Sequence, residues 1–425
     1  MPPFIIGHAT HPDAHMALAL AAVQLDAQRA AQADAAPATL GLMYLTSAYA
    51  PQADSLLAEA QQRWPGVLWA GCVGVGVLAG AVEYFDEPAL VLMLAALPAG
   101  SFQIFNGRQS LADGLRTHTA LVHADPNTPE LDALVAELAE RTTTGYLFGG
   151  LSSGMSGDPA SNASQPAHWA DGVFSGGLSG VAFGPEVHLV SRVTQGCQPV
   201  GPARRITAAD RNLVLTLDNQ PALGLLLADL NLSLDKPQQA LAGLRSTLAG
   251  LTDGRDEVLS RGGQFGADTR VRHLIGIDPG RHGVAVAEQL QTGQQLSFCR
   301  RDMAAARRDL VRICAEIREE LDIAAEAASP AGAEPDAEPP GVAASAQPDM
   351  PPAQQGQRAA ARVAGAIYVS CSGRGGPHFG APSAEAQILQ HALGDVPLVG
   401  FFAAGEIARH HLYGYTGVLT VFVTS

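Results

Sequence analysis

The sequence predicts an α/β protein of two related units, each with mixed or antiparallel sheets covered by helices. Short apolar runs alternate with amphipathic helical patterns through roughly the first third of the chain, and consecutive strand patterns follow over 171–193. Hydrophobic residues make up 47% of the 425 residues and charged residues only 16%, which suffices for more than one core. A helix–sheet–sheet–helix sandwich is one arrangement that would bury both sheets.

The N-terminal unit, expected over 1–193, contains sequence patterns typical of strands and of amphipathic helices. LGLMYLT at 40–46 is typical of a buried strand, and 53–63 places Leu56 and Leu57 on one helical face. Further helices are expected over 13–32 and 130–141, and further strands over 67–72, 81–85 and 89–97. The segments VFSGGLSGVAF and VHLVSRV, joined at Gly184-Pro185, predict a hairpin.

The second unit is expected over 194–425. Proline at the first helical position places a helix at Pro221, and Asp302 is a suitable N-cap for another. Residues 324–362 are rich in Ala, Pro, Glu and Gln, with almost no large apolar side chains, so they predict a disordered insertion that serves as a linker. Strands are expected over 205–207, 212–217, 271–277, 283–287 and 295–299, with a turn at Asp218-Asn219.

Composition argues against several function classes. A net charge of −15 disfavours a nucleic-acid binder, and the absence of a run of about 18 uncharged apolar residues disfavours a membrane span. Five scattered cysteines without CxxC spacing suggest neither a disulfide framework nor a zinc module. The N-terminus lacks a signal-peptide pattern. We therefore expect a soluble cytoplasmic protein with no cofactor; arginine-rich, lysine-poor composition is typical of a GC-rich bacterium.

Two patterns that suggest ligands are rejected. The glycines at 71, 74, 76 and 80 have the wrong spacing for a dinucleotide fingerprint, and a strand pattern follows them instead of a helix. His8, His11 and His15 could share a helical face, but Pro12 interrupts it and no carboxylate completes a metal pattern. No metal site is expected.

The stretch AIYVSCSGRGGPHFG at 366–380 is the candidate binding site. A buried strand ends at Cys371, and Gly373, Gly375 and Gly376 leave backbone amides exposed around Arg374. Such amides can form an anion-binding nest, and a guanidinium can hold a carboxylate by two hydrogen bonds. Ser383 is expected to cap the following helix, with Gly394 just past its end. The alternative is a tight turn in which the glycines only satisfy positive φ angles.

Cys371 supports a second interpretation. A thiol beside an arginine and near a helix start could have a lowered pKa and act as a nucleophile or redox sensor, with His378, His410 or His411 as the base. The alternative for a free cysteine is a small buried hydrophobe.

The motifs, taken in order, resemble the FIST family, with its paired FIST N and FIST C domains. The chain departs from the pattern in Ala403-Ala404, where more polar residues are expected, and in the insertion at 324–362. The matching residues are Gly71-Cys72, Gly149-Gly150, Gln195-Gly196-Cys197, Pro199, Gly201, Thr207, Asn212, Leu217, Pro221-Ala222, Arg301-Asp302, Cys371-Ser372-Gly373-Arg374-Gly375, Phe379-Gly380, Gly400-Phe401-Phe402, Gly405-Glu406-Ile407 and Tyr415-Thr416.

The resemblance implies a bacterial ligand-sensing role in signal transduction, with amino acids or similar small carboxylates as ligands and no established catalytic set. Arg374 and the glycine amides would suit the carboxylate, and Glu406 the ammonium, unless Glu406 pairs with Arg409 on a short helix. Arg301 is a further candidate, or a surface charge beside the helix cap. No output segment is recognisable in the sequence, so any signal is expected to pass to a separate protein.

Three hypotheses of different classes follow. A sensor predicts a polar-lipped pocket around Arg374 and Glu406. A thiol-dependent hydrolase or transferase predicts Cys371 within hydrogen-bonding reach of a histidine. A protein-interaction scaffold predicts an exposed apolar patch.

Overall fold

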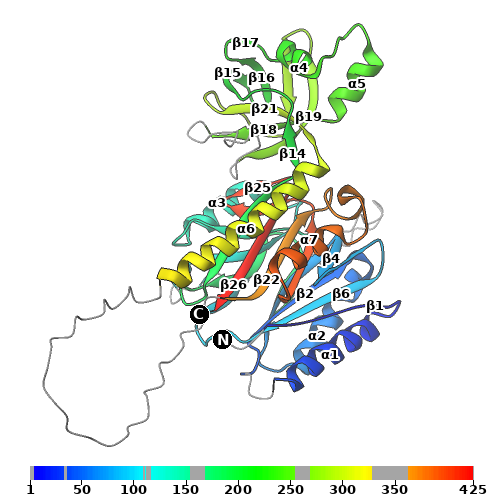
Figure 1. The fold of residues 1–425 in the computed structure, drawn as a ribbon, viewed down its shortest axis with the longest axis vertical. Helices are drawn as coiled ribbons and strands as arrows, with labels where there is room; N and C mark the ends of the chain where they lie inside the picture. The colour runs from blue at the N-terminus through cyan, green and yellow to red at the C-terminus, as the bar shows by residue number, and fades with distance from the viewer. Residues whose placement is uncertain are drawn as a thin grey trace, which may run out of the picture.

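The computed structural model describes residues 4–32, 36–108, 111, 116–153, 168–253, 269–327 and 362–424. These form a body of three sheets and a smaller barrel lobe, which lies at the N-terminal end of helix α6 (Met303–Ala327) (Figure 1). Helices and mixed sheets alternate as the sequence predicts, so the α/β assignment is confirmed.

The first sheet of the body comes from the N-terminal part of the chain. Helices α1 (Ala14–Ala30) and α2 (Ala53–Arg63) pack on its outer face through a core that includes Leu18, Leu56 and Trp69. Its strands, in spatial order, are β1 (Ile5–Thr10), β6 (Ala89–Ala95), β2 (Leu40–Thr46), β3 (Leu68–Gly74), β10 (His168–Ala170) and β11 (Val173–Phe174).

The second sheet combines strands from both ends of the sequence. Helices α6 (Met303–Ala327) and α7 (Ala384–Leu393) cover its outer face, with Leu310, Ile317 and Leu389 in the intervening core. Its strands, in spatial order, are β13 (Leu189–Gln195), β26 (Thr416–Thr424), β22 (Arg362–Cys371), β23 (Leu398–Ala403), β4 (Gly76–Ala79) and β5 (Val82–Phe85).

The third sheet is also mixed and is covered by α3 (Leu131–Glu140), which buries Val135 and Leu138 against it. Its strands, in spatial order, are β25 (His411–Tyr413), β24 (Glu406–Arg409), β9 (Leu147–Leu151), β8 (Thr119–Ala124), β12 (Leu178–Phe183) and β7 (Phe102–Phe105).

One core fills the space between the three sheets. It joins Tyr44 and Met93 of the first sheet, Val369 and Phe401 of the second, and Phe148 of the third, all essentially inaccessible to solvent. Helices therefore lie outside and sheet faces inside, which is the predicted helix–sheet–sheet–helix order with a third sheet added.

Each sheet contains one parallel strand pair joined by a helix, and each pair has a glycine at the equivalent place. A Cβ on Gly71, Gly149 or Gly400 would lie 1.8, 1.9 or 1.7 Å from the carbonyl oxygen of the paired residue on the first strand. These glycines permit close strand packing and are unrelated to nucleotide binding.

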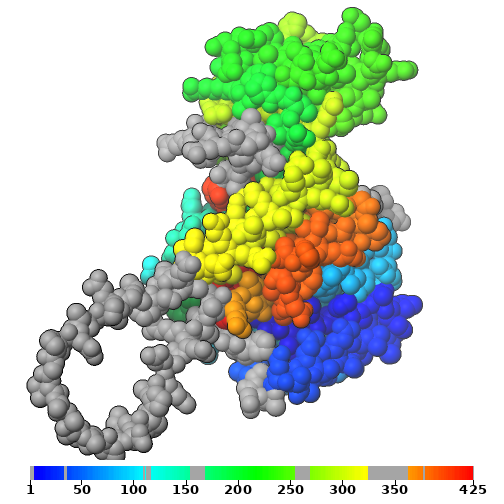
Figure 2. Space-filling view, viewed as in Figure 1, coloured from blue at the N-terminus to red at the C-terminus, as the bar shows by residue number. Residues whose placement is uncertain are grey.

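The barrel lobe is formed by residues between β13 and α6. Its six main strands are antiparallel and close into a ring because β18 pairs with β21 as well as β19. Figure 2 shows this lobe beyond the N-terminal end of α6. Its elements are β14 (Cys197–Pro199), β15 (Arg204–Asp210), β16 (Leu213–Leu217), β17 (Gln220–Pro221), α4 (Ala222–Leu230), α5 (Pro237–Arg245), β18 (Thr247–Thr252), β19 (Arg270–Asp278), β20 (Gly283–Val286) and β21 (Gln295–Arg301).

Two predicted elements need correction. The hairpin at Gly184-Pro185 is wrong, because β12 pairs with β7 and β8 whereas β13 pairs with β26 in another sheet. The linker predicted over 324–362 is too wide at both ends, because α6 continues to Ala327 and β22 begins at Arg362. The remainder of that segment lies outside the described residues.

Candidate functional site

The loop between β22 and α7 follows Cys371 and carries Arg374 and the predicted glycines, and its buried half is held by an ion pair. The Arg374 side chain is only 1% exposed and donates from Nε and Nη2 to Oε1 of Glu385, at 3.2 and 3.1 Å. Nη1 donates to the carbonyl oxygens of Thr194 and Tyr415. Glu385 also accepts from the hydroxyl of Tyr368 at 2.6 Å. Arg374 is therefore fully engaged with protein groups and is not presented to a ligand.

The amide of Gly376 is likewise occupied from within the protein. Glu83 of β5 accepts from the amide of Gly376 at 3.2 Å and from the amide of Ala386 at 2.8 Å. A Cβ on Gly375 would lie 2.1 Å from Cζ of Phe85, so an aromatic ring fills the space beside it. The loop does bind a carboxylate, as its glycine pattern predicts, but the carboxylate belongs to Glu83.

The N-terminal cap of α7 also differs from the prediction. Ser383 precedes the helix, but its side chain makes no capping hydrogen bond, and it accepts from the amide of Glu83 instead. The carboxylate of Glu83 takes its place by binding the helix amide of Ala386. Gly394, with φ of 83°, ends the helix as predicted.

The other end of the loop lies where the barrel lobe meets the body. A Cβ on Gly373 would lie 3.4 Å from the Tyr415 ring, 3.6 Å from Nη1 of Arg301 and 3.7 Å from Sγ of Cys371. The Arg301 guanidinium stacks over the Tyr415 ring at 3.9 Å and donates to its hydroxyl. Because Arg301 is solvent-exposed, this end presents a cation beside a residue with no side chain.

Tyr415 connects the lobe to the body. Its hydroxyl lies 2.5 Å from Nε2 of His273 in β19, and its backbone has the left-handed φ of 61° that a bulky residue seldom adopts. Such strain tends to occur where a side chain must be held in one place. Burial lowers the pKa of His273, and the charge of Arg301 lowers it further, so the neutral imidazole is favoured.

Cys371 is poorly suited to nucleophilic chemistry. Burial, reinforced by the nearby Glu406 carboxyl, raises the pKa of its thiol to about 12, despite the opposing effects of the Gly373 and Tyr415 amides and of Arg374. The thiolate is therefore scarcely populated at neutral pH.

Two of the predicted histidine bases, His410 and His411, have recorded contacts with groups other than this thiol. His411 in β25 faces Asp253 at 4.0 Å, and the His410 ring lies 3.8 Å from that of His411. The side chain of His378 lies outside the described residues.

Glu406 is fully buried and is not available as an exposed anion. It begins strand β24, so the short helix predicted there is wrong. One carboxylate oxygen accepts from the hydroxyl and the amide of Thr416, at 2.6 and 3.1 Å. Burial nevertheless raises the pKa of Glu406 to about 8, against the lowering effects of Thr416, Arg374 and Cys371.

Of the remaining predictions, Asp302 does cap α6, since its carboxylate accepts from the amide of Ala305. Sequence reasoning missed Glu83, Glu385, Tyr415 and His273 as members of this cluster. Glu385 lies on the helix that follows the glycine loop, a position where a carboxylate could have been paired with Arg374. His273 and Glu83 come from distant strands, and no local pattern links them to the loop.

The fold is that of an α/β protein in which Arg301, Gly373 and Tyr415 lie together where the barrel lobe meets the body. The FIST N domain model matches residues 39–220 and the FIST C domain model matches residues 222–409. The chain therefore belongs to the FIST family, whose domains are associated with sensory signal transduction and small-ligand binding.

Mycobacterial relatives match this chain along nearly its whole length. It is 31% identical to an uncharacterized protein of Mycobacterium tuberculosis, covering 98% of this chain and 99% of the relative. It is 30% identical to an uncharacterized protein of Mycobacterium bovis, covering 98% of each. Within the described ranges, no helix combines the length and apolar character that crossing a bilayer requires.

Proposed function

We propose that this protein is a cytoplasmic sensor that binds a small carboxylate, an amino acid or a related acid, and signals through a separate protein. The observation that carries the proposal is the exposed Arg301 guanidinium, stacked on Tyr415 above Gly373. Membership of the FIST family supports the small-ligand role.

Arg301 is the residue best placed to receive the ligand carboxylate. Stacking on Tyr415 fixes the plane of the guanidinium, and the planar fork is suited to a bidentate carboxylate. Gly373 has no side chain that would stand between a ligand and the Arg301 guanidinium. A ligand here would touch β21 and β19 of the barrel together with Tyr415 of the body, so binding would bias how the two parts sit against each other.

The same geometry disfavours the alternatives. Arg374 and Glu406 are buried and already bonded, so neither would meet the ligand. The raised pKa of Cys371 argues against a thiol-dependent hydrolase or transferase.

A thermal-shift screen of the full chain against amino acids and small carboxylic acids tests the proposal. A ligand at about 100 times its dissociation constant should stabilise the folded state by about 2.7 kcal/mol. Arg301→Ala should abolish that shift. Arg300→Ala is the matched control, because Arg300 is the exposed neighbour on the same strand and removing it leaves the Arg301–Tyr415 stack intact.

An equal loss of the thermal shift in Arg301→Ala and Arg300→Ala would show that binding depends only on general positive charge. That result would contradict the proposal that Arg301 binds the ligand. No shift with any compound in the wild-type protein would contradict the carboxylate-sensor proposal.

A further inference from the structure

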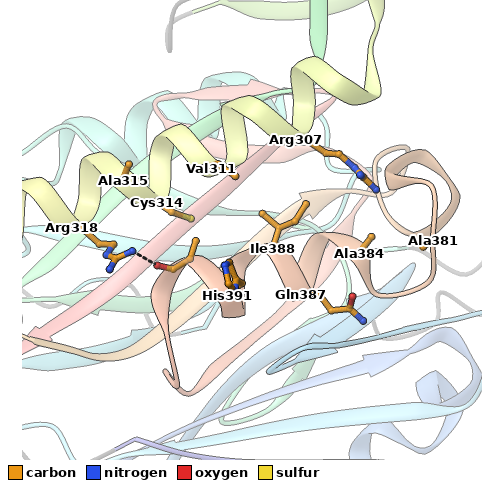
Figure 3. A pocket seen from close by; sticks show the side chains of 11 residues that line it. Arg307, Val311, Cys314, Ala315, Arg318, Ala381, Ala384, Gln387, Ile388 and His391 are labelled. Atoms are coloured by element: carbon orange, nitrogen blue, oxygen red, sulfur yellow. Dashed lines mark hydrogen bonds between the residues drawn. The ribbon is translucent and has the colours of Figure 1, made fainter.

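A groove runs along the outer surface of the body between α6 and α7, away from the Arg301 site (Figure 3). Its volume is about 590 Å³. Val311 and Ala315 of α6 and Ile388 of α7 line its apolar part. Val311 lies on the solvent side of α6 and is 51% exposed, so this apolar surface has no covering element among the described residues.

The charges around the groove are all of one sign. Arg307 and Arg318 lie toward its two ends, with His391 of α7 between them (Figure 3). No aspartate or glutamate is among the lining residues, although the chain as a whole has 41 acidic and 26 basic side chains. A basic groove on so acidic a protein is selective for an anionic partner.

Both arginines have unused binding capacity. Arg307 donates to the carbonyl oxygen of Phe379, and Arg318 donates to that of Ala392 at 3.0 Å. Neither forms an ion pair with any residue in the part of the chain that the structure describes. A guanidinium has five N–H donors, so each can still bind a carboxylate.

The spacing of the arginines indicates the size of the partner. Arg318 follows Arg307 by eleven positions in the helix, which corresponds to about 16 Å along α6. An extended peptide covers that distance with about five residues, at roughly 3.3 Å each. A small acid would reach only one of the two cations.

We infer that this groove docks an acidic amphipathic peptide segment of a separate protein. Its acidic side chains bind Arg307 and Arg318, and its apolar side chains cover Val311 and Ile388. The inference rests on the proposed sensory function, because this partner would receive the signal.

The groove is connected to the sensory loop by direct contacts. Arg307 binds the carbonyl of Phe379, which lies in the loop that begins at Ser372 and Gly373. At the other side of the loop, Glu385 of α7 is paired with Arg374. A displacement of the loop by ligand would therefore shift α7 relative to α6 and change the width of the groove.

Fluorescence anisotropy with the full chain tests the inference. The probe is a fluorescein-labelled peptide of about eight residues, alternating glutamate and leucine. The corresponding lysine–leucine peptide is the probe control and should not bind. Arg307→Glu and Arg318→Glu should each weaken glutamate–leucine binding by about tenfold or more, since each loses a charge-assisted contact and gains a like charge.

Arg308→Glu is the matched protein control. It makes the same charge change on the adjacent exposed residue of α6, which does not line the groove, so it should change the affinity by less than about twofold. Circular dichroism would establish that each variant is folded.

Three results would overturn the inference: no binding of the acidic peptide, equal weakening by Arg308→Glu, or a wild-type dimer in sedimentation that Arg307→Glu dissociates. The last would assign the groove to a second copy of the chain. Absence of any ligand-induced thermal shift in the wild-type protein, with peptide binding retained, would count against the Arg301 site alone. Intact thermal shifts without peptide binding would count against the groove alone.

Discussion

Two strand–helix–strand units of the body, β2–α2–β3 and β22–α7–β23, share a scaffold but differ in the loop that follows the first strand. In both, a helix joins two parallel strands, and a glycine of the second strand packs against a carbonyl of the first, at Gly71 and at Gly400. The backbone requirements of the two units are therefore the same.

The two loops differ in charge: the first has no charged side chain, whereas the second buries charged groups. Residues 47–52 after β2 contain no charged side chain, and Tyr49 is buried with its hydroxyl bonded to the carbonyl of His11. The loop after β22 instead buries Arg374 with Glu385 and receives Glu83 at its amides. Since the loop of the first unit has no charged side chain, the buried ion pair and the Glu83 carboxylate of the second are not required by the scaffold. They fix the position of the loop that carries Gly373.

Of the changes that test this difference between the loops, removing one partner of the Arg374–Glu385 pair should alter the free energy of unfolding most. Arg374→Ala should lower the free energy of unfolding by about 3–5 kcal/mol, because Glu385 would remain buried without its counter-charge. Urea denaturation would measure it. The double variant Arg374→Met/Glu385→Leu should recover much of the loss. A cost below about 1 kcal/mol for Arg374→Ala would contradict the structural role.

The equivalence of the two scaffolds is tested by Gly71→Ala and Gly400→Ala. Each added methyl would meet a backbone carbonyl at less than 2 Å, so each should cost about 1–3 kcal/mol or more through overpacking. Thermal denaturation should place the two variants within about 1 kcal/mol of each other. A harmless substitution at either position would show that the two units are not equivalent.

Glu406 gives a smaller, pH-dependent effect beside the charged loop. Its pKa is about 8 in the folded protein and near 4.5 in the unfolded chain, so the folded state binds more protons between these values. Its contribution to stability is complete below about pH 4.5 and is lost as the pH rises toward 8, with a slope of at most about 1.4 kcal/mol per pH unit.

Glu406→Gln should remove that slope from the pH dependence of unfolding. Urea titrations from about pH 5 to pH 8 would show it, with the wild-type protein as reference. Identical pH profiles for the two proteins would contradict a buried, protonated Glu406.

The local parts of the fold could be predicted from the sequence, and the long-range parts could not. Strand β2 and helix α2 have the predicted bounds, since each is marked by its own period and end residues. The supposed hairpin at Gly184-Pro185 failed because its two strands find better partners in different sheets, β13 pairing with the distant β26. The closed barrel depends on the pairing of β18 with β21, for which no adjacent turn gives a signal.

In the candidate site, too, local features could be predicted from the sequence and long-range contacts could not. The glycine loop and its affinity for a carboxylate follow from local residue types. The identity of that carboxylate, Glu83, depends on a contact between residues 293 positions apart in the sequence. An arginine among glycines suits an anion, so the sequence favours Arg374 as the residue that contacts the ligand. Only burial, which sequence does not reveal, separates its role from that of Arg301.

Strand β26 has a consequence for how the chain is made. It lies between β13 and β22, and β23 beside them pairs with β4. While residues 416–424 are still inside the ribosome, β13 and β22 lack their common neighbour, and β4 has waited since early in synthesis with an unpaired edge. Such edges are prone to pair with other chains, and distant pairings form slowly. Translation speed and chaperone supply should therefore influence the yield of native protein more than its final stability would suggest.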